Sequence, residues 1–273
     1  FIQNYVHIED KDMLLDPDTP GVARKFILWA DQIKTLALIL RNRLIIILKA
    51  RQLGLTWLAL AYAVWRMLFF PGYTVNALSK KENPDAKELV RRIRFILEHL
   101  PPWMARERGP DVPKDYPGVV WETSVLKVIV HHPDRVAEDG ERTKQPPSTF
   151  QSFSAAPDSG RSFTANLVIL DEWAFQPYAE EIWDSAYPTI NRPTGGQVIG
   201  LSTGKKGTFF EKVWMMAKTG LNRFVTIFLP RWADPRRDQA WYDDTKANMP
   251  NTYQREYPAT EEDAFAVGEG AFF

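Results

Sequence analysis

The sequence has no cysteine, no excess of either charge, and no apolar run long enough to cross a membrane. The missing thiols exclude a disulfide scaffold and a thiolate zinc site, and they fit a reducing cytosol. Thirty-four basic residues balance 34 acidic ones, so no global field would hold the whole molecule on DNA or on an anionic membrane. Any contact with nucleic acid is therefore expected to be local and transient. The apolar run at residues 57–65 (WLALAYAVW) is shorter than a membrane span.

What is present is enough apolar sequence for a large folded core. The chain has 273 residues, of which 45% are hydrophobic and 13% aromatic, which suits one α/β core or a core with a small appendage. Apolar strand patterns alternate with helical patterns, and this alternation predicts a mostly parallel sheet flanked by helices. The strands are expected at 44–50, 74–79, 150–156, 167–171, 197–204 and 223–229, and the helices at 20–40, 56–70, 83–100 and 207–218.

Other segments predict less regular structure. The third helix is expected to begin with Asn83 as its cap and Pro84 in its first turn. Residues 101–118 are typical of a surface loop, 119–132 of a β-hairpin beside the sheet, and 133–147 of a mobile insertion. From Arg231 the composition becomes more polar and indicates two short helices in a small subdomain.

A strand that breaks at a glycine and restarts as a helix is typical of a phosphate-binding loop. The segment KARQLGLT, residues 49–56, fills the eight places of the pattern G-x-x-x-x-G-K-[ST] with two mismatches. Lys49 stands where the first glycine belongs, and Leu55 stands where the lysine belongs. Because such a loop wraps around a phosphate, an ammonium at position 49 is expected to meet the same charge. The alternative is that Lys49 merely ends a strand and the loop binds nothing.

A second strand, LVILDEW at residues 167–173, ends in two adjacent carboxylates. A strand end needs no carboxylates, and burying unpaired charge costs several kcal/mol, so we interpret Asp171 and Glu172 as functional. Thr56 and Asp171 are oxygen donors suited to Mg²⁺, and Glu172 is placed to activate water. Thr56 as a simple helix cap is the alternative. Together the two motifs predict an Mg²⁺-dependent ATPase.

The order of the motifs KARQLGLT, LVILDEW, GLSTG and YQREYPATEEDAF resembles the ATPase part of tailed-phage large terminases, from about residue 29 to residue 273. The resemblance implies a P-loop NTPase fold of the RecA-like (ASCE) class with a small helical lid. It also implies an ATPase core over 1–230, a lid over 231–260, and a linker over 261–273 toward a nuclease domain absent from this chain. Nuclease activity is therefore not expected here.

The resemblance also implies roles for individual residues. Gln32 matches the glutamine that reads adenine, Arg51 an arginine that moves with nucleotide state, and Arg161 an arginine that reaches the ATP of a neighbouring subunit. Asp171 matches the Mg²⁺-linked carboxylate and Glu172 the catalytic one. The nucleotide-contacting set is Gln32, Lys49, Ala50, Arg51, Gln52, Leu53, Gly54, Leu55, Thr56, Ser202 and Thr203.

Several of these residues have simpler explanations. Gln32 on an amphipathic helix usually faces water, Arg161 is equally typical of a solvated loop or a salt bridge, and Ser202 with Thr203 is typical of a strand-end turn. His131 and His132 are adjacent in a strand and point to opposite faces, which argues against a shared metal site. A basic set that is usually solvated but able to touch phosphate backbone comprises Lys80, Lys81, Arg91, Arg92 and Arg94.

For a large terminase the implied partners are double-stranded DNA, a portal protein and a small terminase subunit. The implied setting is a ring on the portal in the cytoplasm of an infected bacterium, with the lone chain monomeric and no membrane contact. Two alternatives stay open. A helicase or remodeller needs a second motor domain, for which the length leaves no room. A nucleotide-binding assembly module with little turnover is suggested by Leu55.

Overall fold

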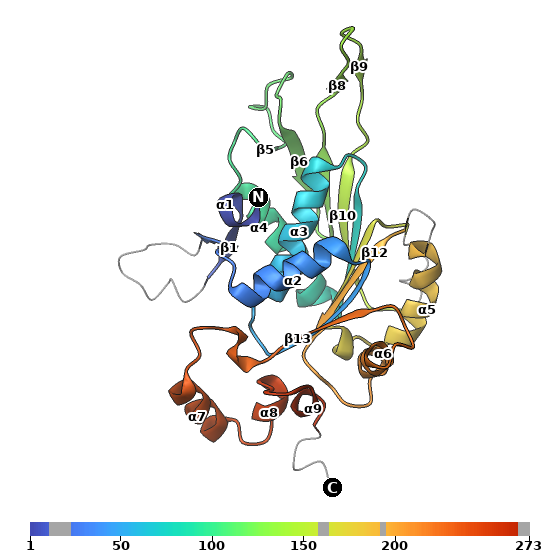
Figure 1. Cartoon of the computed structure of the whole chain (residues 1–273). Helices are drawn as coiled ribbons and strands as arrows, with labels where there is room; N and C mark the ends of the chain where they lie inside the picture. Colours follow the sequence, from blue (N-terminus) through green and yellow to red (C-terminus); the bar gives the residue numbers. More distant parts are fainter. Residues whose placement is uncertain (11–22, 158–163, 192–194, 267–273) are drawn as a thin grey trace.

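The computed structural model describes residues 1–10, 23–157, 164–191 and 195–266 (Figure 1). In this part of the chain, nine strands form one central sheet. Their order is β13 (Val225–Leu229), β3 (Leu44–Lys49), β12 (Gln197–Ser202), β11 (Leu167–Asp171), β4 (Thr74–Ser79), β10 (Ser148–Ser154), β7 (Lys127–His131), β6 (Val119–Thr123) and β5 (Ala105–Glu107). The first six strands of that order pair in parallel, whereas β7 pairs antiparallel with both β10 and β6.

The apolar run of β3 shows why this sheet needs helices on both faces. Ile45 and Ile47 join one hydrophobic cluster, and Ile46 and Leu48 join the other, because successive side chains of a strand point to opposite faces. A strand buried on both faces reads as a continuous apolar run, as this one does. The sequence prediction of a mostly parallel sheet is therefore confirmed.

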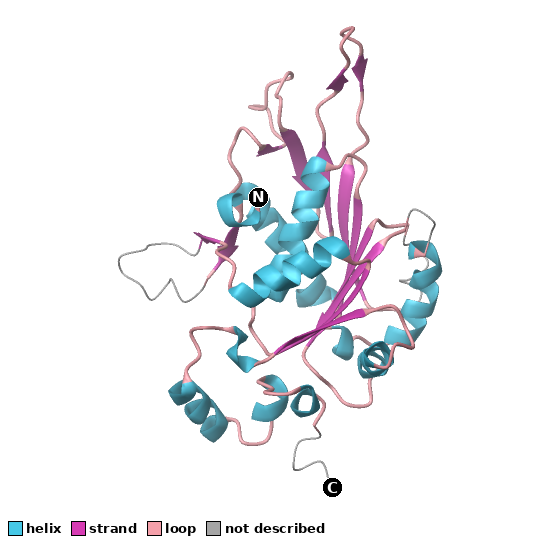
Figure 2. Cartoon of the chain, viewed as in Figure 1, coloured by secondary structure: helices cyan, strands magenta, loops and turns pink. Residues whose placement is uncertain are grey.

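Helices cover the two faces of the sheet separately (Figure 2). One face carries α2 (Ala30–Arg41), α3 (Leu55–Phe69) and α4 (Lys87–Glu98), which share a hydrophobic cluster with the sheet. The other face carries α5 (Ala179–Ile190) and α6 (Phe209–Lys218) around the buried Trp173 and Trp214. α3 is apolar on most faces and is almost wholly buried, as its sequence predicted.

Short elements complete the molecule. At the N-terminus, α1 (Ile2–Tyr5) precedes the hairpin of β1 (His7–Glu9) and β2 (Ala23–Lys25). A second small hairpin, β8 (Arg135–Val136) with β9 (Arg142–Thr143), extends from the β6–β10 end of the sheet (Figure 1). Near β13 lie α7 (Gln239–Asn248), α8 (Tyr253–Glu256) and α9 (Glu261–Ala264).

The C-terminal helices are attached to both sides of the core. Tyr242, Tyr253 and Tyr257 belong to the same cluster as α3, whereas Ala264 and Phe265 belong to the cluster that contains α6. The indole Nε1 of Trp214 in α6 also donates to Glu261 at 3.1 Å. Residues 261–266 are thus folded onto the core, which corrects the linker expected from residue 261.

The structure corrects three other expectations. The helix expected over 20–40 begins only at Ala30, because Phe26 and Leu28 are buried while Ile27 is 64% exposed, the alternation of extended chain. Residues 20–22 lie outside the described residues. Asn83 does not cap the helix, because α4 begins only at Lys87, after the π-helical turn Glu82–Ala86 that contains Asn83.

The third correction is an omission, because α5 was not predicted. Its buried residues Ile182, Ala186 and Ile190 recur every four positions, as on one helical face, but Pro188 lies within the same segment and weakens the pattern. In the described part of the chain, no helix is long and apolar enough to span a bilayer.

A substitution at Gly200 in β12 can test how tightly the second face of the sheet is packed. A Cβ at this position would lie 2.4 Å from the ring of Trp173, which is 1% exposed. We expect Gly200→Ala to lower the free energy of unfolding by about 1–3 kcal/mol, because the ring has no room to move. Urea unfolding measures this, with Gly109→Ala as control, since no atom lies within 4 Å of that added Cβ. Equal stability of the two variants would contradict the packing described.

Candidate functional site

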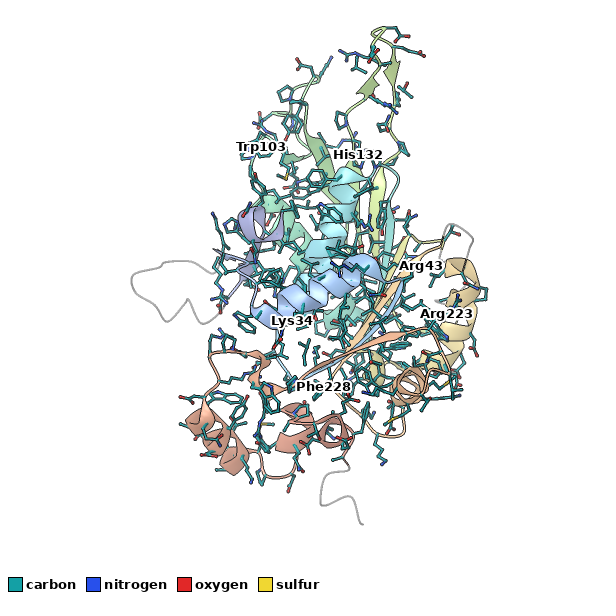
Figure 3. All side chains as sticks on the ribbon, in the orientation of Figure 1. Lys34, Arg43, Trp103, His132, Arg223 and Phe228 are labelled. Atoms are coloured by element: carbon teal, nitrogen blue, oxygen red, sulfur yellow. The ribbon has the colours of Figure 1, made fainter. Side chains whose placement is uncertain are left out.

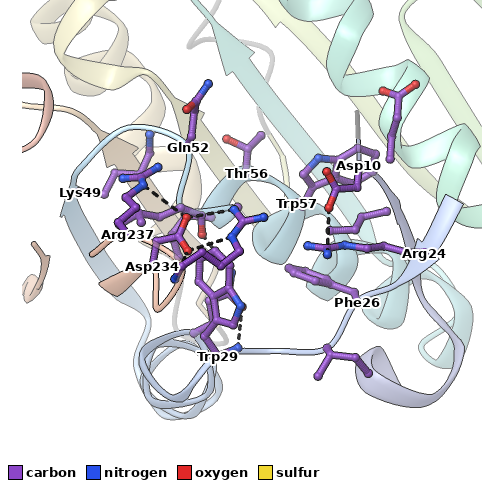
Figure 4. Close-up of a pocket in the computed structure, with 18 of the residues that line it drawn as sticks. Asp10, Arg24, Phe26, Trp29, Lys49, Gln52, Thr56, Trp57, Asp234 and Arg237 are labelled. Atoms are coloured by element: carbon purple, nitrogen blue, oxygen red, sulfur yellow. Dashed lines mark hydrogen bonds and ion pairs between the residues drawn. The ribbon is translucent and has the colours of Figure 1, made fainter. Parts of the chain in front are cut away.

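The two motifs found in the sequence meet at one edge of the sheet. β3 and β11 are separated only by β12 and run parallel, so Lys49 and Asp171 emerge at the same edge. In an open α/β sheet this carboxyl edge is where ligands bind. A cavity of about 710 Å³ lies there, and the loop at 49–56, Glu172 and residues of the C-terminal segment line it (Figure 4).

The loop after β3 has the backbone shape of an anion site. Gln52 and Gly54 both have left-handed angles, with φ of 60° and 68°, and α3 begins directly afterwards at Leu55. Successive N–H groups in such a turn, followed by a helix N-terminus, form a concavity that suits phosphate. Gly54 is required because its φ is positive and because a Cβ would lie 3.0 Å from Nε2 of Gln32.

The side chains of the loop divide into ligand-facing and core-facing sets. Ala50, Leu53 and Leu55 are buried in the main hydrophobic cluster, so they offer only their backbone to a ligand. Leu55, at the position of the usual lysine, therefore places no charge at the cavity. Lys49 and Gln52 line the cavity instead (Figure 4).

Lys49 is held against the second motif. It is only 5% exposed, and its Nζ lies 3.3 Å from Oε1 of Glu172. The position of Lys49 is set by the adjacent Ala50, whose N–H donates to the carbonyl of Leu229 at the end of β13. The ammonium at position 49 therefore contacts the carboxylate of Glu172 at the cavity, and its contact with phosphate stays a prediction.

Glu172 itself adopts a left-handed backbone, with φ of 48°. Such angles are uncommon outside glycine and concentrate at functional sites. The turn after it is fixed by Trp173, and the side chain of Glu172 stays 39% exposed, so it is accessible to water.

Thr56 and Asp171 form the second contact between the motifs. The hydroxyl of Thr56 donates to Oδ1 of Asp171 at 2.9 Å. Burial, and then the negative charge of Glu172, raise the pKa of Asp171 from 3.8 to about 6, against the opposing effects of Lys49 and Thr56. A carboxyl with this pKa is one that a bound cation would stabilise in its charged form.

The donor set fits Mg²⁺. Mg²⁺ binds through one or two protein oxygens together with waters and substrate phosphates, and Thr56 and Asp171 supply two such oxygens. Among the described residues, no group of three or more His, Asp or Glu side chains is placed to hold a metal without phosphate. His131 and His132 have separate partners, Glu122 and Ser148, and His132 lies in the β6–β7–β10 extension away from this edge (Figure 3).

Gln32 is at the cavity, but both ends of its amide already have partners. Its Nε2 donates to the carbonyl of Leu53 at 3.0 Å, and its Oε1 accepts from the N–H of Trp29 at 2.9 Å. Gln32 is 3% exposed and ties the start of α2 to the phosphate loop. Its contact with adenine stays a prediction.

The side chain of Arg51 contacts the C-terminal helices. Its Nε lies 2.9 Å from Oε2 of the buried Glu256 in α8, and its N–H donates to the carbonyl of the same residue. The carbonyl of Arg51 accepts from Nη2 of Arg237 at 2.9 Å. The loop is thus fastened to the C-terminal segment by three contacts.

The remaining residues expected at the site are less close to it. Ser202 and Thr203 are buried and line neither this cavity nor the next. The hydroxyl of Ser202 accepts from the N–H of Ala174 at 3.2 Å, two residues after Glu172. Arg161 lies outside the described residues.

Sequence reasoning missed the wall of the cavity that the C-terminal segment supplies. The buried Asp234 binds Arg237 (Figure 4) and Arg236. The guanidinium of Arg236 lies over the ring of Trp29. These residues are about 200 positions from Trp29 in the chain, and only the shift in composition at Arg231 pointed to them.

A second cavity, of about 410 Å³, adjoins the first. Thr56, Glu172 and Arg92 line both cavities, so the two adjoin at these residues. Charged side chains of α4 and its preceding turn form the outer wall. The lining residues are Arg51, Thr56, Ser79, Lys80, Asp85, Glu88, Leu89, Arg92, Asp171, Glu172 and Phe175.

Known proteins resemble the chain in sequence and in fold. No protein-family profile matches the chain. The large terminase subunits of Thermus phage G20c and Thermus virus P23-45 are each 28% identical to it over 151 residues, which cover 49% of this chain and 30% of either relative. The matched part of the chain thus spans about 30% of the length of those relatives.

Solved structures extend the similarity to the fold. A mutant ATPase domain of the Thermus phage P74-26 large terminase superposes with a TM-score of 0.63 at 22% identity, over 88% of this chain and 95% of that one. The chain has the fold of a phage large-terminase ATPase domain. The large terminase of another thermophilic bacteriophage, in complex with ADP, gives a TM-score of 0.60 at 14% identity, over 86% of this chain and 53% of that one. The predicted α/β P-loop NTPase fold is confirmed.

The raised pKa of Asp171 predicts how pH affects stability. A carboxyl whose pKa is raised on folding binds more protons in the folded chain, so the free energy of unfolding falls as pH rises from about 4 to about 6. We expect Asp171→Asn to stabilise the ligand-free chain by about 1–3 kcal/mol at about pH 8 and not at about pH 4.

Urea unfolding at the two pH values measures this difference. The control is Asp115→Asn, a carboxylate in an exposed loop, for which the stability should not change at either pH. A gain of the same size at both pH values would show that packing, and not buried charge, limits stability at Asp171.

Proposed function

We propose that the chain is the ATP-hydrolysing motor domain of a viral large terminase, which drives double-stranded DNA into a procapsid. The observation that carries this proposal is the joint placement of the phosphate loop, Lys49 and the Asp171–Glu172 pair around one cavity. The similarity to terminases covers only part of those proteins, and a lone domain of this kind needs the other parts to package DNA.

The first step is binding. The triphosphate lies on the N–H groups of the loop between Ala50 and Leu55, with the ammonium of Lys49 against its charge. Thr56 and Asp171 would hold Mg²⁺, which would supply further positive charge to the phosphate oxygens. Gln32 keeps the loop in shape through its bond to Leu53, and the base is taken to lie toward Trp29 and Arg236.

The second step is hydrolysis. Glu172 orients a water molecule and accepts its proton while the water oxygen attacks the γ-phosphorus. The bond from that phosphorus to the bridging oxygen breaks, and ADP and inorganic phosphate are the products. Lys49 interacts with both the base and the substrate, because it contacts Glu172 and faces the phosphate site. Charge on the phosphoryl oxygens is further met by Arg51 and, from a neighbouring subunit, by Arg161.

The third step is coupling to movement. The lid, residues 231–260, is fastened to the loop through Arg51, Glu256 and Arg237, and a nucleotide that draws Arg51 toward its phosphates releases one of these contacts. Ser202 and Thr203 lie between the Glu172 turn and Gly204, where a Cβ would be 2.0 Å from the carbonyl oxygen of Ala264. A change at Glu172 is thereby passed to α9.

The expected partners follow from this task. They are a DNA duplex held by transient backbone contacts, a portal protein and a small terminase subunit, in a ring of such chains in the cytoplasm of the infected host. Because Arg161 would act on a neighbour, a single chain should hydrolyse ATP slowly.

Two variants separate binding from turnover. We expect Lys49→Ala to weaken ATP binding by about 10- to 100-fold, because it removes the main cation of the loop, and Glu172→Gln to keep binding while hydrolysis falls by about 100-fold or more. Calorimetry measures binding, and phosphate release measures turnover. Lys34→Ala is the control, since Lys34 lies on the exposed face of α2 (Figure 3).

The outcomes distinguish the motor from the nucleotide-binding assembly module. Binding without turnover in the unmodified chain, under conditions that allow ring assembly, would favour the nucleotide-binding assembly module. Full hydrolysis by Glu172→Gln would remove Glu172 as the base.

The contact between Arg51 and Glu256 gives a further expectation. Because Glu256 competes with the phosphates for the Arg51 guanidinium, Glu256→Gln should raise ATP affinity by about two- to tenfold. Titration with ATP, with the exposed Glu262→Gln as control, measures this. Reduced affinity would instead mean that Glu256 holds the loop in its binding shape.

A further inference from the structure

Three arginines of α4 have different surroundings, although the sequence placed them in one solvated set. Arg91 pairs with Glu9 and Glu88 on the outer surface, and Arg94 pairs with Glu98 at 2.7 Å. Arg92 alone of the three lines both cavities, together with Thr56 and Glu172. It faces the site that the chemistry uses.

The side chain of Arg92 is held in this position from two sides. Its Nε lies 3.0 Å from Oε1 of Glu88, and its guanidinium lies over the ring of Trp57, 5.1 Å from the centroid. Trp57 is 8% exposed and belongs to the core, so it provides a fixed surface for the guanidinium. Within the described residues, no acceptor contacts either Nη group. The half of the guanidinium that could bind an anion is thus left available.

The negative groups at the site favour the binding of such a cation. Lys49 contacts Glu172, while Arg51, which lines the second cavity, is engaged by the buried Glu256. A triphosphate brings further negative charge to a site that already holds Asp171 and Glu172, so another cation with unengaged donors would stabilise its binding.

We propose that Arg92 donates through its Nη groups to the terminal phosphate of ATP bound in the same chain, and so distinguishes triphosphate from diphosphate. Glu88 and Trp57 orient the guanidinium, so little side-chain freedom is lost when the phosphate binds. This inference rests on the proposed ATPase function. It adds a cation from within the chain to the one that Arg161 would supply from a neighbour.

The test compares the affinities of two nucleotides. Because the contact is with the terminal phosphate, Arg92→Ala should weaken ATPγS binding by about tenfold or more and leave ADP binding within about twofold. The rate of ATP hydrolysis should also fall. Arg94→Ala is the matched control, since it removes the same charge from the same helix on a surface 48% exposed, and both affinities should stay unchanged.

Two more variants address the role of the side chain. Arg92→Lys keeps the charge and the stem but loses the fork, and it should recover part of the preference for ATPγS over ADP. Glu88→Gln should reduce the same preference less than Arg92→Ala does, because it loosens the guanidinium without removing it. Thermal unfolding of each variant reports whether it is folded.

Each outcome has a definite meaning. Equal weakening of both nucleotides by Arg92→Ala, or no weakening of either, overturns the inference. If the unmodified chain binds ATPγS and ADP but Arg92→Ala keeps the full preference, the inference fails and the proposed function stands. If the unmodified chain binds neither nucleotide, the proposed function fails, and the role of Arg92 is rejected with it.

Discussion

The pairing of Lys49 with Glu172 and of Thr56 with Asp171 is the constraint on which the site depends. Each pair joins the loop after β3 to the end of β11. These two strands are not neighbours in the sheet, because β12 lies between them, so both contacts reach across the end of β12. The apolar strands beneath are buried on both faces, and this packing fixes the height at which each strand ends. Small displacements of β3 against β11 would separate both pairs at once. The hydrophobic core thus sets the geometry of the polar site.

The displaced lysine follows from the same packing. The seventh place of the loop begins α3, and in this chain α3 is buried on nearly all sides, so the side chain at 55 enters the core. A leucine there stabilises the helix through its apolar area, whereas a lysine would have to extend out of the core to reach a ligand. Lys49, the last residue of β3, reaches the carboxylate of Glu172 without having to extend out of the core. Core packing and the positive charge at the cavity are therefore assigned to different positions.

Local patterns predicted the parts of the molecule that local interactions determine. The continuous apolar runs indicated β3, β4 and β11, and the glycine at 54 indicated the loop, because a left-handed turn is needed there. The helix α5 was missed because Pro188 interrupts an otherwise regular buried stripe. The partners of Arg51 and the orientation of Arg92 were not predictable, since Glu256 and Trp57 reach them only through tertiary contacts. Pairing of side chains distant in sequence leaves no periodic signal.

The close approach of Gly204 to α9 has a mechanical consequence. Backbone there touches backbone, with no side chain between the end of β12 and the carbonyl of Ala264. Side chains can change rotamer and absorb a displacement of an ångström, whereas two main chains in direct contact cannot. A displacement of the backbone at the end of β12 would therefore displace α9 directly, because no side chain at this contact can absorb it by changing rotamer.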